Sequence, residues 1–300
     1  TRINRHLGAF FSPPKVNAAA AKFALRGAPA PAGAAAEPAE KPSIEIPPEF
    51  SPHQFAIMLL HIAAEIEHAL MVEYLYAAYA LGGPQVPEDK RQMVTCWQEV
   101  IAGIAKEEMG HLMTVQNLLR GLGGPLDLDR EDYPWDSGFL PFPFRLEPLQ
   151  LGSLSRFIVA ESPVDWSGSL ADEIHQQAQE GLGGEVKLHR VGELYDLIYE
   201  IIKDPTLILD SHFRASTLPY QANWDEWGRG YKGGARGNST GGSPKGTPDV
   251  LLLPVTSRTE ALAAIKAIST QGEACPDDSA DAPFIEQPRA DARTTKPMDT

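Results

Sequence analysis

Two long helical patterns joined by a short turn constrain the fold more than any other feature of this sequence. The first starts at Ser51-Pro52, where proline suits the first helical position, and its apolar pattern covers residues 55–81. Gly82-Gly83-Pro84 ends it, and a second pattern then covers about 87–121. Because the connection is short, we expect the two helices to pack antiparallel as half of a helical bundle.

The rest of the chain predicts two more long helices and several irregular segments. We expect these helices at about 185–203 and 258–272, and a short helix over 151–160. Residues 125–148 contain too many prolines for a regular helix, so they predict an irregular crossover, rich in aromatic side chains, over one end of the bundle. The predicted fold class is therefore all-α, a four-helix bundle with a long crossover.

The two ends of the chain and one internal loop are expected to lie outside this bundle. Residues 1–50 begin with an Ala- and Pro-rich stretch that contains no acid before Glu37, which predicts a disordered or docking arm, with a transit-peptide remnant as the alternative. Residues 228–248 are rich in Gly, Ser and Lys and predict a flexible insertion, and 274–300 predict an irregular tail. The bundle domain is thus predicted to span 51–273.

Charge and composition exclude several classes of partner. The chain has 40 acidic and 26 basic residues, and its formal charge of -14 would repel nucleic acid and anionic membrane surfaces. The longest apolar stretches fall well short of the roughly 20 residues that span a bilayer. Two cysteines, Cys96 and Cys275, build neither a disulfide framework nor a Cys-based zinc site. We therefore expect a soluble, cytoplasmic protein, or an organellar one if residues 1–50 hold a targeting remnant.

The strongest chemical signal lies in the second helix, where Glu108 and His111 interrupt an apolar stripe. Side chains three residues apart lie one turn apart on one helix face, so both can reach a single ion. An ionised Glu on a buried face needs a compensating charge, which a metal supplies. Taken alone, however, one Glu-x-x-His motif more often marks a hydrogen-bonded core histidine. The neighbouring Glu107 lies on a less apolar row and is expected at the rim.

The other three helices each offer a carboxylate to the same core. In the first helix, spacing does not choose between Glu67, on an apolar row, and Glu65, which forms a second Glu-x-x-His with His68. Glu193 and Glu273 lie on apolar rows of the third and fourth helices, although their places near helix ends would also suit solvated side chains. Carboxylates on four core faces would destabilise a bundle without a cation, so together they predict a metal site of the kind that suits iron.

Seven short motifs between residues 51 and 273 carry a resemblance. They are IEHALMVEYLYAAY at 66–79, EEMGHL at 107–112, NLL at 117–119, GGP at 123–125, FIVAESP at 157–163, VGELY at 191–195 and QGE at 271–273. Together they resemble the ferritin-like domain of the iminophenyl-pyruvate dimer synthase family. The resemblance implies a ferritin-like four-helix bundle with a non-haem iron site. The best-known members of that family couple two imino acids oxidatively in violacein- and rebeccamycin-type pathways.

The resemblance also implies a set of metal ligands. It favours Glu67 over Glu65 and selects Glu108 over Glu107, and the full set is Glu67, Glu108, His111, Glu193 and Glu273. Related sequences continue into a Ser-His-aromatic segment that supplies another histidine, whereas this chain reads Asp277 to Phe284 there. The second histidine ligand is therefore unassigned. His189, one turn before Glu193, is the first replacement candidate, and the weaker ones are His61, His68, His175 and His212.

Two functions from different classes follow from these expectations. The first is an iron-dependent oxidase or oxygenase with one or two non-haem ions, which uses O2 and a small, amino- or imino-acid-derived substrate in a pocket shaped by the crossover. The alternative is a non-catalytic ferritin-like subunit with a degraded metal site, whose terminal arms bind a protein partner or a second copy. Iron storage ranks third, because the insertions and tails would hinder packing into a shell.

Overall fold

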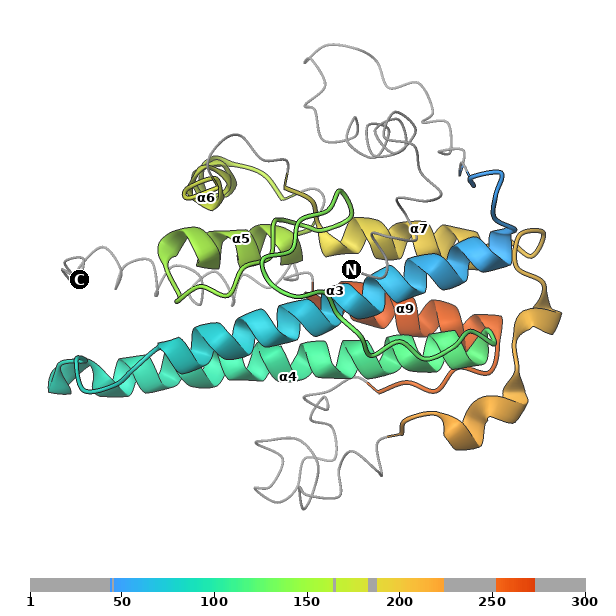
Figure 1. The fold of residues 1–300 in the computed structure, drawn as a ribbon, viewed down its shortest axis with the longest axis horizontal. Coiled ribbons are helices and arrows are strands. Elements are labelled where there is room, and N and C mark those ends of the chain that lie inside the picture. The colour runs from blue at the N-terminus through green and yellow to red at the C-terminus, as the bar shows by residue number, and fades with distance from the viewer. Residues whose placement is uncertain (1–43, 45, 164–165, 183–187, 224–251, 273–300) are drawn as a thin grey trace, which may run out of the picture.

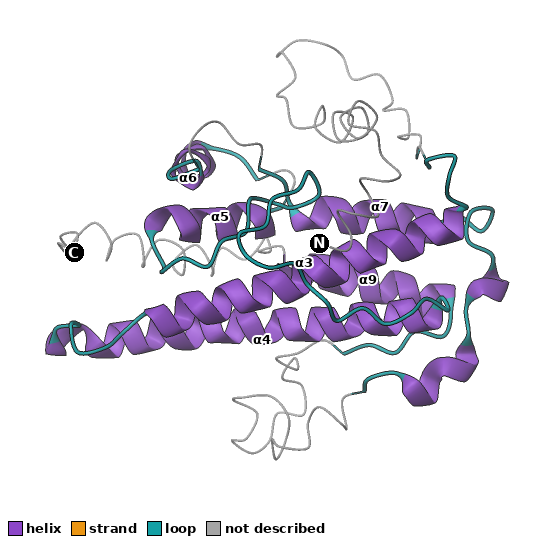
Figure 2. Cartoon of the chain, in the orientation of Figure 1, coloured by secondary structure: helices purple, strands orange, loops and turns teal. Residues whose placement is uncertain are grey.

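The computed structural model describes residues 44, 46–163, 166–182, 188–223 and 252–272. Within these ranges the regular structure is helical, apart from one isolated bridge between Trp135 and Phe144 (Figure 2). The helices are α3 (Pro52–Ala80), α4 (Arg91–Gly121), α5 (Leu151–Glu161), α6 (Ser169–Ala178), α7 (Val191–Lys203) and α9 (Arg258–Gly272), with short 3₁₀ turns at Glu88–Lys90, Asp210–His212 and Ala215–Tyr220. The all-α prediction is confirmed. The predicted insertion at 228–248, the tail at 274–300 and most of the arm at 1–50 lie outside the described residues.

The start of α3 follows from a capping box. The Ser51 side chain accepts a hydrogen bond from the Gln54 backbone N–H at 3.3 Å, and the Gln54 side chain accepts one from the Ser51 N–H at 3.0 Å. Two backbone donors that a helix start leaves unpaired are thereby satisfied. The N-terminus predicted from Ser51-Pro52 is confirmed.

Four helices close into a ring around one core. α3 packs against α4 and α7, α9 packs against α7 and α4, and α3 runs antiparallel to α4 (Figure 1). Leu60, Leu70, Leu118, Ile198 and Ile265 represent the fully buried side chains that fill this core. α3 and α4 continue past the other helices at one end of the bundle, at the left of Figure 1. The predicted four-helix bundle is thus observed.

α3 is buried on nearly all sides. By length and composition it is the one helix in the described part of the chain that would pass for a membrane span, but 67% of its apolar window is buried inside the protein. A helix in the middle of a core needs apolar residues all round. Ile44, Ile46 and Phe50, just before α3, also pack against this core.

Two helices differ from the sequence prediction. α7 begins at Val191 rather than near residue 185, because Arg190 is extended and the backbone N–H of His189 donates to the Pro141 carbonyl at 2.8 Å. α6 was not predicted. It buries Ile174 and Ala178 in a small cluster with Val159, and Ala171 is also buried. Three apolar positions in so short and polar a segment give only a weak helical period.

The crossover lies along α3 instead of over one end of the bundle, as its green trace in Figure 1 shows. The Tyr133 hydroxyl donates to the Ala69 carbonyl at 2.6 Å, and the Arg145 backbone N–H donates to the Glu73 carboxylate at 2.5 Å. Nearer its start, the Asp127 backbone is held by the side chain of Gln116 from α4. The crossover therefore covers the face of α3 that points away from the other bundle helices.

Candidate metal centre

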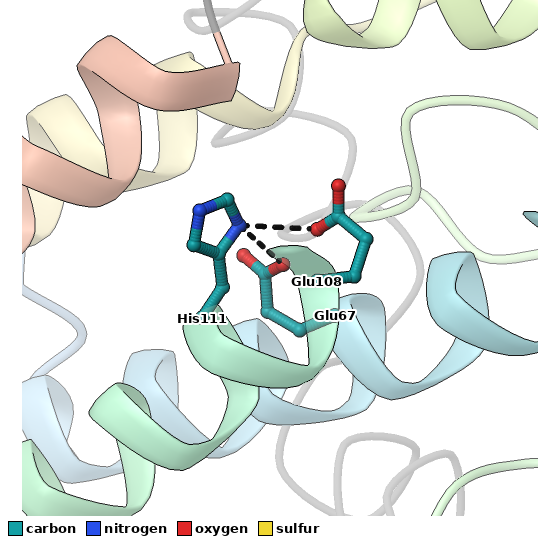
Figure 3. A group of neighbouring side chains, drawn as sticks. All are labelled: Glu67, Glu108 and His111. Carbon is teal, nitrogen blue, oxygen red and sulfur yellow. Dashed lines mark hydrogen bonds and ion pairs between the residues drawn. The ribbon is translucent and has the colours of Figure 1, made fainter. Parts of the chain in front are cut away.

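Three of the predicted ligands meet in the bundle core. Glu67 comes from α3, and Glu108 and His111 come from α4, and each offers a ligand atom within 4.8 Å of the other two (Figure 3). Their exposed fractions are 1% for Glu67, 3% for Glu108 and 3% for His111. Such burial of two carboxylates is costly unless a positive charge lies between them.

Helical spacing explains why these side chains converge. Glu108 and His111 lie one turn apart on the face of α4 that also buries Ala105, Val115 and Leu118. Glu67 lies on the row of α3 that buries Leu60, Ala64 and Tyr74. The antiparallel packing of α3 on α4 places these two rows against each other, so the two carboxylates and the imidazole share one space. Glu107, by contrast, is only partly buried.

The hydrogen bonds leave a vacant acceptor at the centre. His111 Nδ1 lies 3.1 Å from Glu108 Oε2 and 3.5 Å from Glu67 Oε2. The Tyr195 hydroxyl from α7 donates to Glu67 Oε1. Glu67 Oε2 is buried and makes no hydrogen bond of ordinary geometry, because its contact with His111 Nδ1 at 3.5 Å is at the limit of hydrogen-bonding distance. One oxygen from each carboxylate and the imidazole thus face a common point, and this donor set of oxygens and nitrogen suits a divalent transition metal.

The charges of the three groups are strongly linked. Burial by itself would raise the pKa of Glu67. The charge of His111 and its contact with Glu67 outweigh burial, together with hydrogen bonds from Glu108 and Tyr195, and lower the pKa below its usual value. Burial and the charge of Glu161 raise the pKa of Glu108 well above its usual value. Burial opposes protonation of His111, yet the charge of Glu108 and the contacts with Glu67 raise its pKa well above normal. Without a metal, His111 is the cation of the core.

A further carboxylate, Glu161 at the end of α5, faces the same site. It lines a cavity of about 10 Å³ together with Glu67, Glu108 and His111, roughly the space that one water molecule needs. The Tyr74 hydroxyl donates to Glu161 Oε1 at 2.8 Å. Burial and the charge of Glu67 raise the pKa of Glu161 to about 7. Glu161 was not among the predicted ligands, although it lies in the FIVAESP motif, which was the available signal.

The remaining walls of the cavity come from Ala160, Val191, Gly192, Tyr195, Ile268 and Ser269. Five helices therefore enclose it: α3, α4, α5, α7 and α9. The crossover contributes none of the residues that line this cavity in the described part of the chain; that its aromatic side chains shape a substrate pocket stays a prediction. The aromatic side chains of the crossover pack beside the cavity, where Phe142 contacts Phe144 and Phe157.

The other two predicted ligands are not part of the observed group. Glu193 is 26% exposed by its side chain and lies 3.8 Å from His189, which is 19% exposed. This pair is partly solvated and absent from the cavity walls, and its role as a ligand pair stays a prediction. Glu273 lies outside the described residues. Of the weaker histidine candidates, His175 bonds to the Ala171 carbonyl and His212 stacks on His53.

Comparisons with known proteins agree with the fold and the motifs. A family model described as ferritin-like matches residues 60–292. Dichlorochromopyrrolate synthase from Lentzea aerocolonigenes is 30% identical, over 46% of this chain and 17% of that protein. This chain therefore corresponds to a small part of that relative's length. No solved structure gives a significant match. The resemblance drawn from the short motifs is confirmed.

Proposed function

Because this chain belongs to the ferritin-like family, we propose that its bundle core holds non-haem iron and that the protein is an oxidase or oxygenase. The observation that carries the proposal is the buried group of Glu67, Glu108 and His111, whose ligand atoms lie within 4.8 Å of one another. Two core carboxylates and one imidazole form a site that a cation stabilises and that gives iron its preferred donor atoms.

Glu67, Glu108 and His111 would hold the metal, and Glu161, which lines the same cavity, would add a carboxylate from α5. Glu193 and Glu273 remain proposed ligands from the sequence motifs. Bound iron would supply the electron-transfer chemistry that O2 needs. Tyr195 and Tyr74 orient Glu67 and Glu161 by donating hydrogen bonds to them. The pKa of both phenols is raised well above the usual value, mainly by burial and then by the charge of the neighbouring carboxylate, Glu67 for Tyr195 and Glu161 for Tyr74. Both hydroxyls therefore stay protonated and can donate.

The substrate would reach the site from one side. Glu161, Gly192 and Ser269 are only partly buried, so the cavity approaches the surface between α5, α7 and α9. A cavity of about 10 Å³ has no room for an organic molecule, and we propose that the substrate binds at this opening while O2 enters. The similarity to a dichlorochromopyrrolate synthase supports a small amino- or imino-acid-derived substrate.

A specific observation favours a second function. Glu193 pairs with His189 instead of entering the core group, so among the described residues α7 adds no carboxylate to that group. The alternative is a non-catalytic ferritin-like subunit that binds a protein partner or a second copy. Its core would then rely on His111 as the cation.

Metal analysis combined with O2 consumption tests the proposal. The full chain, purified without chelator, is expected to contain iron and to consume O2 when Fe(II) is supplied. Glu67→Gln should lose most of the iron, because the amide cannot replace the anionic ligand, whereas Glu107→Gln, one position from Glu108 and only partly buried, should keep it. A wild-type chain with no iron, and none taken up on reconstitution, would favour the non-catalytic subunit. Iron without O2 consumption would remove the oxidase assignment.

A further inference from the structure

A second group of metal-binding side chains lies on the opposite side of α3. His61, Glu65 and His68 are spaced four and three residues apart, so they share one face of the helix. Glu65 and Glu67 are two residues apart, about 200° around the helix, and therefore point to opposite sides. The group faces the start of the crossover and is separate from the core site.

His61 has one oriented ring nitrogen and one unpartnered ring nitrogen. Its Nδ1 lies 3.3 Å from Asp127 Oδ2. Its Nε2 is buried and has no hydrogen-bond partner. Metal-binding histidines commonly donate one ring N–H to a carboxylate and use the other nitrogen as the ligand. Asp127 would play the orienting part here.

His68 repeats this arrangement one turn beyond Glu65. The backbone oxygens of Leu128 and Asp129 act as its hydrogen-bond acceptors. Its Nδ1 is buried and has no hydrogen-bond partner. Both histidines thus have one oriented nitrogen and one vacant nitrogen.

Glu65 lies between the two histidines and is the most buried of the three, with 4% exposure. Its Oε2 is also buried and accepts no hydrogen bond. After burial, the strongest electrostatic influences on Glu65 are the charges of Asp127, Glu131 and Asp129. The carboxyl therefore faces the acidic start of the crossover. A buried polar atom without a partner is costly, and three of them on one helix face need a common explanation.

The acidic segment opposite α3 is held in a fixed position. Gln116, itself 3% exposed, accepts a hydrogen bond from the Asp127 N–H at 2.8 Å and donates one to the Asp127 carbonyl at 2.5 Å. Asp127 is thereby placed beside His61 by the backbone and not by its own flexible side chain. Such prior orientation is what a binding site requires.

We propose that His61, Glu65 and His68 bind a divalent transition-metal cation on the outer side of α3, with Asp127 positioning His61. Two imidazoles and one carboxylate favour zinc, iron or cobalt over magnesium or calcium. In the described part of the chain only the core group has three ligand atoms within 4.8 Å of one another. His61, Glu65 and His68 therefore move closer together when the ion binds. Both histidines are only partly buried, which gives them room to turn and gives the ion access.

Zinc and cobalt binding to the full chain test this site. Wild type should take up one Zn(II) more than Glu65→Gln or His68→Ala, and Co(II) should give a ligand-field absorption that both variants lose. Asp127→Asn should weaken this binding about 10- to 100-fold, the usual effect of losing an orienting partner. His175→Ala is the matched control, because His175 bonds within its own helix and lies outside both sites.

The outcomes separate this site from the core site. His111→Ala should lose the core metal and keep the extra Zn(II), so either site can fail without the other. If Glu65→Gln and His68→Ala bind as much Zn(II) as wild type while their circular dichroism shows the native helix content, the proposal is overturned. Glu65→Gln is nearly isosteric with the wild-type side chain, so it controls for unfolding of the histidine variant. Zinc should raise the melting temperature of wild type but not that of Glu65→Gln.

Discussion

Glu65 and Glu67 are buried to almost the same extent on one helix, 4% and 1% exposed, yet their pKa values shift in opposite directions. Burial, followed by the charge of Asp127, raises the pKa of Glu65 to about 8. Burial acts on Glu67 too, but hydrogen bonds and charge from His111 lower its pKa. His111 beside Glu67, with no comparable partner beside Glu65, therefore separates these two almost equally buried carboxylates.

The two sides of α3 consequently have different needs. The inner side has its own cation in His111, so it can stay charged without a metal. The outer side has two histidines, each with an unpartnered ring nitrogen, a buried Glu65 between them and several acids nearby, so it needs either a proton on Glu65 or an added cation. The inner group should therefore govern stability most strongly, and the outer group should respond most to added metal.

The largest expected effect comes from removing the inner cation. His111→Ala leaves Glu67 and Glu108 buried together without a counter-charge, and breaking a buried ion pair from one side costs roughly 3–5 kcal/mol. Chemical unfolding of the metal-free protein should show this loss, and the metal content should fall. His175→Ala is the control. Equal unfolding free energies for wild type and His111→Ala would mean that His111 is not the counter-charge of the core.

The bundle and the centre of its site were predictable because they depend on local patterns. Ser51-Pro52 marks the start of α3, and the stripe around Glu108 and His111 sets which side of α4 faces the core. The apolar row of Glu67 indicated its inward position, although Glu65 competed with it. These features depend on one or two helical turns, which a sequence records directly.

The parts that were missed depend on contacts between distant segments. Glu161 reaches the cavity because α5 packs against α3, where Tyr74, far away in the sequence, donates a hydrogen bond to it. α7 starts later than predicted, so Glu193 lies in its first turn beside His189, and its role as a ligand stays a prediction. The path of the crossover along α3 depends on Gln116 and Tyr133, whose partners no local pattern identifies.

Glu161 offers a smaller test of the inner side. Glu161→Gln keeps an oxygen that can accept from Tyr74 but removes a charge that faces Glu67 and Glu108. If Glu161 is a metal ligand, iron affinity should fall about 10-fold or more, although the metal-free protein should become no less stable, because less negative charge is buried. Titration of the apoprotein with Fe(II) under anaerobic conditions measures this. Glu107→Gln is the matched control, and unchanged affinity in Glu161→Gln would exclude a ligand role.

The smallest expected effect concerns Glu73, a third buried glutamate of α3, with 3% exposure. Burial raises its pKa to about 8, although the Arg145 backbone hydrogen bond and the charge of Arg156 oppose this. Unlike Glu67 it has no histidine partner, and unlike Glu65 it has no vacant imidazoles beside it. Glu73 is therefore expected to respond to pH and not to metal.

The sign of this response follows from the raised pKa. The folded protein keeps the proton on Glu73 up to about pH 8, whereas the unfolded chain releases it near the ordinary value of 4.5. Glu73 therefore supports folding fully below pH 4.5, and this support is lost as pH rises toward 8. Glu73→Gln has no proton to lose, so its stability relative to wild type should rise between about pH 5 and about pH 9. Urea unfolding at both pH values measures the change, with the exposed Glu99→Gln as control. A difference between Glu73→Gln and wild type that does not vary with pH would show that Glu73 is ionised in the folded protein, and its backbone hydrogen bond would then have to offset burial as His111 does for Glu67.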